Sequence, residues 1–85
     1  MGTNNSEKNP FTRLQGQYLA YIATYMKLHR RPPAEADLQS YFGVTPPSVH
    51  GMILTLEKRG LISRRPGRAR SIEVLVPQDQ VPALD

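Results

Sequence analysis

Positively charged side chains gather in one short stretch near the carboxyl end of the chain. Six of the eleven lysines and arginines lie between residues 58 and 70, and no acidic residue interrupts them. Such a cluster beside a folded core is typical of a surface that binds phosphate groups. The alternative is a charged surface that only keeps the protein soluble. The candidate phosphate contacts are Lys58, Arg59, Arg64, Arg65, Arg68 and Arg70.

The other chemistry-bearing residues do not form a recognisable catalytic or metal site. The chain has no cysteine, which excludes disulfides, thiolate metal sites and a catalytic thiol. His29 and His50 are far apart in sequence and lack a carboxylate at ligand spacing. No nucleophile with a base and no glycine-rich phosphate loop can be assembled. We therefore predict no enzymatic activity, no cofactor, no metal and no small-molecule ligand.

Length and composition predict one small domain with a tail at each end. The chain has 85 residues and a net charge of +4. Residues 1–10 are polar and unpatterned, and residues 77–85 hold prolines with little periodicity, so both are predicted to be flexible. The folded domain then spans residues 11–76. No apolar run approaches the roughly 20 residues of a membrane span, and the opening lacks a secretory signal, which predicts a cytoplasmic protein.

Apolar spacing predicts a long first helix. It begins after the capping residue Thr12 and ends near Arg30 or Arg31, because Pro32 and Pro33 remove backbone donors. Its predicted core face is Leu14, Tyr18, Tyr21, Ile22, Tyr25 and Leu28. If the tyrosines cannot all be buried, the excess marks a face for a homodimer.

Two shorter helices follow, joined by a tight turn. The second helix runs from about Ala34 to Phe42 and stops at Gly43, which suits the left-handed position after a helix. The third begins after the capping residue Thr45 and ends at Gly60. Its inward stripe is Val49, Met52, Ile53 and Leu56, and its outward or flanking residues are Pro47, Ser48, His50, Gly51, Leu54 and Lys58.

The last part of the domain changes from helical to strand periodicity. The runs "LISRR" and "SIEVLV" predict two strands of a hairpin. Between them, Pro66 and Gly67 occupy the central positions that a type II turn requires. The predicted fold is therefore mainly α with a small β-hairpin, a three-helix winged helix-turn-helix in which the hairpin is the wing.

The stretch "RPPAEADLQSYFGVTPPSVHGMILTLEKRGLISRR" and the closing "SIEVLV" resemble the N-terminal DNA-binding domain of LexA-type repressors of bacteria and phages. The apolar positions of the helix-turn-helix pattern match Leu38, Phe42, Val44, Val49 and Met52, and Gly43 matches the turn. The resemblance covers Thr12 to about Val76. It does not extend to the self-cleaving peptidase domain of that family, so the Ser-Lys chemistry of that domain is not expected here.

The resemblance implies that the start of the third helix enters the major groove of double-stranded DNA. The candidate base-reading residues are then Thr45, Pro47, Ser48, His50, Gly51 and Leu54. The cations of the wing and of the helix end would contact phosphates, with Arg68 a candidate for the minor groove. We therefore predict a DNA-binding transcriptional regulator. The alternative is a winged helix that binds another protein, which the scarcity of base-reading side chains favours.

Overall fold

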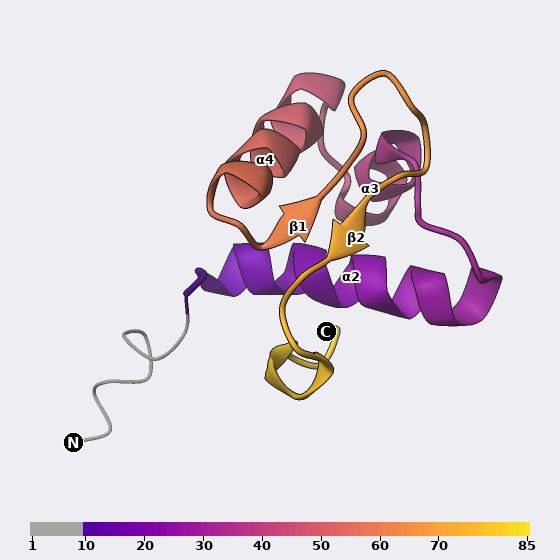
Figure 1. The fold of residues 1–85 in the computed structure, drawn as a ribbon. Helices are drawn as coiled ribbons and strands as arrows, with labels where there is room; N and C mark the ends of the chain where they lie inside the picture. The colour runs from indigo at the N-terminus through magenta and orange to yellow at the C-terminus, as the bar shows by residue number, and fades with distance from the viewer. Residues whose placement is uncertain (1–9) are drawn as a thin grey trace.

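The three predicted helices and the hairpin are all present in the computed structural model, which describes residues 10–85. The elements in chain order are α2 (Arg13–His29), α3 (Glu35–Phe42), α4 (Pro46–Lys58), β1 (Ile62–Ser63), β2 (Glu73–Val74) and the short 3-10 helix η2 (Gln78–Gln80). In Figure 1, α3 and α4 lie above α2, with the two strands in front. The predicted fold class is confirmed. Apart from Pro10, the predicted N-terminal tail lies outside the described residues.

Helix α2 begins and ends where the capping signals predict. The Thr12 hydroxyl accepts the N–H of Gln15, whose side chain accepts the N–H of Thr12. After the helix, Arg30 adopts a left-handed conformation with φ of 61°. No helix within residues 10–85 is long and apolar enough to cross a membrane.

The predicted core face of α2 is wrong at both ends. Leu14 is 53% exposed and Leu28 is 73% exposed, whereas Leu19 and Ala20, which the prediction omitted, are buried. Neighbouring segments cover the middle of α2 from more than one side, so its buried surface is wider than a single stripe. In the first turn Gln15 and Gly16 are buried while Leu14 is exposed, and in the last turn Leu28 is exposed.

The connection between α3 and α4 is a tight turn built on one glycine. Gly43 has a φ of 66° and donates its N–H to the carbonyl of Gln39. At the start of α4, the Thr45 hydroxyl accepts the N–H of Ser48. Ala34 has no polar side chain to cap α3, and instead the Asp37 carboxylate accepts the Ala34 N–H at 2.8 Å. The starts of α3 and α4 are therefore both capped by side chains within their own first turns.

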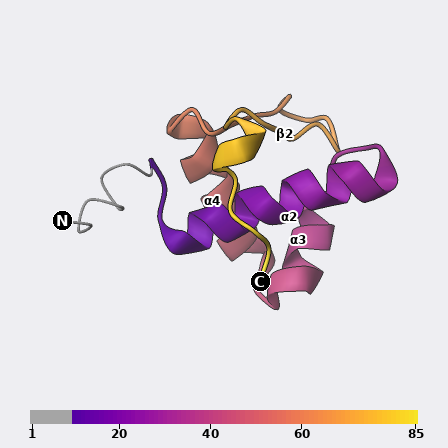
Figure 2. The same ribbon diagram turned by 90° about the horizontal axis from the view of Figure 1, so that it is seen from below.

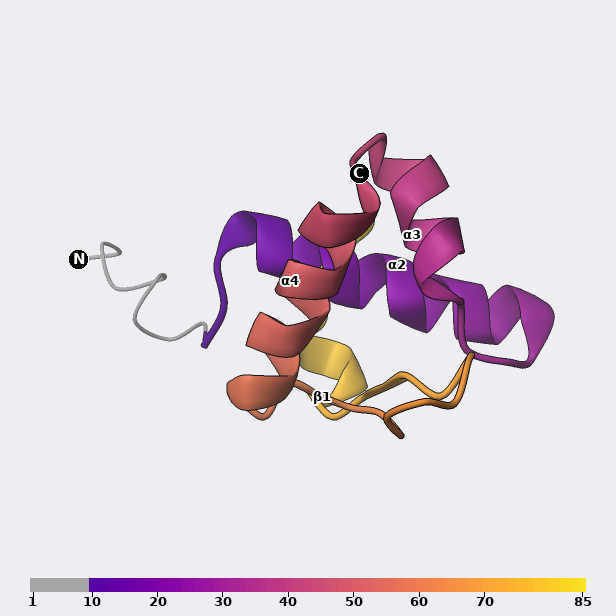
Figure 3. The ribbon, with the colours of Figure 1, turned by 90° about the horizontal axis from the view of Figure 1, so that it is seen from above.

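The core lies between α2, the α3–α4 pair and the hairpin. Its fully buried side chains include Leu19, Ile22, Leu38, Val49, Ile53 and Leu56. The ring of Tyr18 stacks on that of Phe42 with centroids 4.2 Å apart. Seen from above, α4 and α3 lie side by side over α2, and the hairpin runs along one edge (Figure 3). The helix-turn-helix is thus held on α2 by apolar packing.

The hairpin, which we call the wing (residues 62–74), has fewer paired residues than predicted. Its register pairs Ile62 with Val74 and Ser63 with Glu73. The predicted type II turn is confirmed, since Gly67 has a φ of 77° and Arg68 donates its N–H to the carbonyl of Arg65 at 3.0 Å. Between the strands and the turn, the Ser71 hydroxyl takes the place of ladder bonds. It accepts the Arg65 N–H at 2.9 Å.

Residues 77–85 pack on α2, which differs from the predicted flexible tail. Figure 2 shows η2 and the chain after it crossing α2 toward α3. A β-carbon on Gly16 would lie 3.0 Å from Pro82, so the glycine allows this close approach. The Gln17 side chain donates to the carbonyl of Ala83. Three side chains bond the backbone or carboxylate of Asp85, namely Arg13, Gln17 and Tyr41.

Candidate nucleic-acid interface

Helix α4 presents a continuous exposed face opposite its buried stripe. Val49, Ile53 and Leu56 are fully buried. All six predicted base-reading residues are exposed, namely Thr45, Pro47, Ser48, His50, Gly51 and Leu54. The helical period therefore predicted correctly which side of α4 faces outward.

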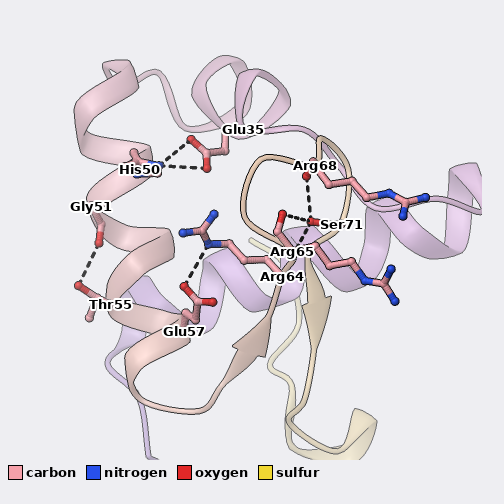
Figure 4. Close-up of polar contacts among 9 residues, drawn as sticks. All are labelled: Glu35, His50, Gly51, Thr55, Glu57, Arg64, Arg65, Arg68 and Ser71. Carbon is pink, nitrogen blue, oxygen red and sulfur yellow. Dashed lines mark hydrogen bonds and ion pairs between the residues drawn. The ribbon is translucent and has the colours of Figure 1, made fainter.

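The centre of this face is open because of Gly51. Apart from its chain neighbours and the backbone of α4 itself, no described atom lies within 4 Å of the position that a β-carbon on Gly51 would occupy. One turn later, the Thr55 hydroxyl donates to the Gly51 carbonyl at 3.0 Å (Figure 4). The helix backbone at Gly51 can therefore be approached closely by a flat or grooved partner.

Three of the polar side chains on this face have partners within the protein. The Thr45 hydroxyl donates to that of Ser48 at 3.0 Å, at the first turn of α4. The Nδ1 atom of His50 lies 3.2 Å from both carboxylate oxygens of Glu35, the first residue of α3 (Figure 4). Sequence reasoning missed this pair because the two residues are distant in the chain. The tight turn at Gly43 brings them together.

Of the four wing arginines, Arg65 and Arg68 are exposed, and their side chains project from the wing away from α4 (Figure 4). Lys58 and Arg59, at the end of α4, are exposed as well. These four cations are available to a polyanionic partner.

Arg64 is placed differently from the prediction. Its Nε donates to the Glu57 carboxylate of α4 at 3.1 Å, and only 17% of its side chain is exposed. The guanidinium is neutralised by a carboxylate and points toward α4 (Figure 4). Arg64 therefore ties the wing to α4 instead of extending into solvent.

Arg70 also turns inward, which corrects its expected position on the outside of the wing. Its Nη1 donates to the Tyr25 hydroxyl at 3.0 Å, the Asp37 carboxylate at 3.2 Å and the carbonyl of Pro32 at 3.3 Å. The hydrogen bond to Tyr25 is the main cause of a raised pKa for Arg70, and Asp37 adds to it. The backbone of Arg70 has a φ of 55°, a left-handed conformation at the point where the chain leaves the wing loop.

An open depression lies between the start of α3, α4 and the wing. Its volume is about 360 Å³, and its lining includes Glu35, His50, Arg64 and Arg68. The carboxylate of Glu35 and the wing cations thus border the same space. Among the described residues, no group of three or more histidine, cysteine or acidic side chains could hold a metal ion.

Comparison with known proteins identifies relatives of this arrangement. Residues 8–71 match the family model of the LexA DNA binding domain. LexA repressors of Thermosipho melanesiensis and Exiguobacterium sibiricum are 31% and 37% identical to this chain over 70 residues, or 82% and 81% of its length. The LexA repressor of Oleidesulfovibrio alaskensis is 33% identical over 85 residues, or 99% of this chain.

The match covers only part of each relative. The aligned regions span 35%, 34% and 40% of the lengths of the three repressors. The matched family model nevertheless covers most of the chain, including α2, the α3–α4 pair and the wing loop through Ser71. The chain therefore belongs to the LexA DNA binding domain family.

Proposed function

We propose that this chain binds double-stranded DNA, with the exposed face of α4 in the major groove and the wing beside it on the backbone. The observation that carries the proposal is the open, outward face of α4 at the end of a tight helix-turn-helix, in a chain that matches the LexA DNA binding domain. A major groove is wide enough to admit an α-helix. The family match favours DNA over the protein partner considered from the sequence.

Base reading falls to the first turns of α4. Ser48 and His50 supply hydrogen-bonding groups, while Pro47 and Leu54 supply apolar contact for thymine methyl groups. Gly51 lets the helix backbone approach the base edges, since it has no side chain and no neighbouring side chain covers it. Few of these contacts are bidentate, so discrimination between bases is modest and phosphate contacts supply most of the affinity.

Phosphate binding falls to the exposed cations Lys58, Arg59, Arg65 and Arg68. Arg68 follows the turn at Gly67, where an inserted arginine would favour a narrow, A·T-rich minor groove. Arg64 and Arg70 hold the wing at its angle, because their guanidinium groups are bonded to residues of α4, α2 and α3.

The relatives that carry this domain are named repressors and are about three times as long as the matched region. We infer that this domain serves a transcriptional repressor acting on DNA in the cytoplasm. One module covers one half-site, so binding to a palindromic operator takes a homodimer.

The test is fluorescence anisotropy of a labelled random-sequence duplex, titrated with the protein from low to physiological salt and competed with single-stranded DNA. The double variant Arg65→Ala/Arg68→Ala should bind more weakly. Its plot of log K against log salt should lose about 0.9 of slope for each phosphate contact removed.

The charge-matched control is Arg13→Ala/Lys27→Ala. Arg13 is bonded to Asp85, and Lys27 lines a depression beside η2, so both lie on the side of α2 occupied by the C-terminal segment. In this control, the slope of log K against log salt should stay close to that of the wild-type protein. A wild-type protein that does not bind duplex at low salt, or that prefers single strands, contradicts the proposal.

A further inference from the structure

The hydrogen-bonded pair of Glu35 and His50 bridges the start of α3 and the second turn of α4. Both carboxylate oxygens lie 3.2 Å from Nδ1 of the ring. The His50 side chain is 52% exposed and that of Glu35 is 34% exposed. Exposed ion pairs contribute little to the stability of a protein. A gain in the stability of the fold therefore does not explain why the Glu35 carboxylate lies beside the face that is proposed to bind DNA.

The geometry fixes where the proton of the imidazole ring sits. An ionised carboxylate can only accept hydrogen bonds, so Nδ1 must carry the proton when it bonds Glu35. In a neutral ring, Nε2 is then an acceptor, and after protonation it becomes a donor. Within residues 10–85, Nε2 bonds to no other group, and His50 is the one side chain bonded to Glu35.

We propose that Glu35 is a positioning residue that determines base specificity through His50. By holding the proton on Nδ1, it makes Nε2 an acceptor that fits the amino group of adenine or cytosine in the major groove. This role rests on the proposed function and assigns one of its base contacts to an acceptor atom, Nε2 of His50.

In the described part of the chain, the other charged groups around the pair are not bonded to Glu35. On the wing, Arg64 and Arg68 line the same depression, but Arg64 is bonded to Glu57 of α4. On α3, the Asp37 carboxylate is bonded to Arg70 and to the Ala34 N–H. Among the described residues, Glu35 is therefore the carboxylate bonded to the ring, and no cation is bonded to it.

The first test reads the ring directly and needs no DNA. We expect the ¹⁵N shifts of His50 in the wild-type protein to show a protonated Nδ1 and an unprotonated Nε2 at alkaline pH. Glu35→Gln should give a mixture of tautomers, because an amide can donate as well as accept. Asp79→Asn in η2 is the charge-matched control and should leave the ring unchanged. A wild-type ring protonated on Nε2 overturns the inference.

The second test measures binding to duplexes that differ at single base pairs of a site selected with the wild-type protein. One position should prefer adenine or cytosine over guanine, by about threefold to tenfold. Glu35→Gln should lose this preference.

The outcomes separate the two proposals. If the wild-type protein binds duplex and Glu35→Gln keeps its base preference, the role of Glu35 is wrong and the proposed function stands. If no form of the protein binds duplex at any pH, while the ring shows the expected tautomer, the proposed function is wrong and the base-reading role falls with it.

Discussion

The exposed face of α4 and the wing lie side by side but are held in place by different forces. Behind α4, the side chains of Val49, Ile53 and Leu56 are fully buried. The base of the wing is anchored by the buried Ile62 and Ile72, whereas its loop has only two paired ladder positions beside it and polar contacts at Arg64 and Arg70. Apolar burial depends on area and tolerates small shifts, whereas hydrogen bonds require particular distances and angles. The helix face and the base of the wing are therefore fixed by the core, and the wing loop by a few polar groups.

The largest effect on the free energy of unfolding is expected from removing a buried side chain that anchors α4 to the core. Ile53→Ala removes a fully buried side chain and should lower the free energy of unfolding by about 2–5 kcal/mol. That is a large part of the roughly 5–15 kcal/mol typical of a domain. Leu54→Ala, on the exposed side of the same turn, should cost less than about 1 kcal/mol. Denaturant unfolding measures both, and similar losses would show that α4 is not anchored by its buried stripe.

A smaller effect is expected from the two left-handed glycines that shape the two regions. Gly43 has a φ of 66° and Gly67 a φ of 77°, and no described atom lies within 4 Å of a β-carbon at either position. Alanine is strained there by about 1–2 kcal/mol from its own backbone. Gly43→Ala should show this full loss, because the turn joins two packed helices.

Gly67→Ala should lose less free energy of unfolding, because the wing turn can rearrange without disturbing the core. The same denaturant measurement compares the two variants. An equal loss at Gly67 would mean that the wing turn folds as one cooperative unit with the helices.

The smallest effect on global stability is expected at Arg70. Arg70→Leu removes the bonds to Tyr25, Pro32 and Asp37, so the wing should lose its fixed angle. Amide hydrogen exchange should become severalfold faster in the wing and stay unchanged in α4. Arg65→Leu is the control, since its exposed side chain should not restrain the wing. Unchanged exchange in Arg70→Leu would assign the wing angle to its strand pairing and to the buried Ile62 and Ile72.

Features set by local chemistry could be predicted from the sequence. Thr12 and Thr45 cap their helices, Gly43 ends α3, and Pro66 with Gly67 forms the type II turn. Each depends on residues within a few positions, where φ limits and capping bonds act. The outward face of α4 followed from the helical period for the same reason.

The contacts that cross between elements could not be predicted. The partners of Arg70 lie on α2, on α3 and in the segment that joins them, and Glu35 meets His50 across the Gly43 turn. These contacts depend on how the helices pack, which no local pattern encodes. The same holds for residues 77–85, since their docking depends on the missing side chain at Gly16, which lets Pro82 pack against α2.

The docking of residues 77–85 on α2 also bears on the order in which the chain folds. Its hydrogen bonds join residues that are 66 to 72 positions apart in the sequence. Closing so long a loop costs more chain entropy than closing the short turn between α3 and α4. Contacts of high sequence separation slow folding in otherwise helical domains. We therefore expect α3 and α4 to pair early, and the last residues to settle against α2 in the final step.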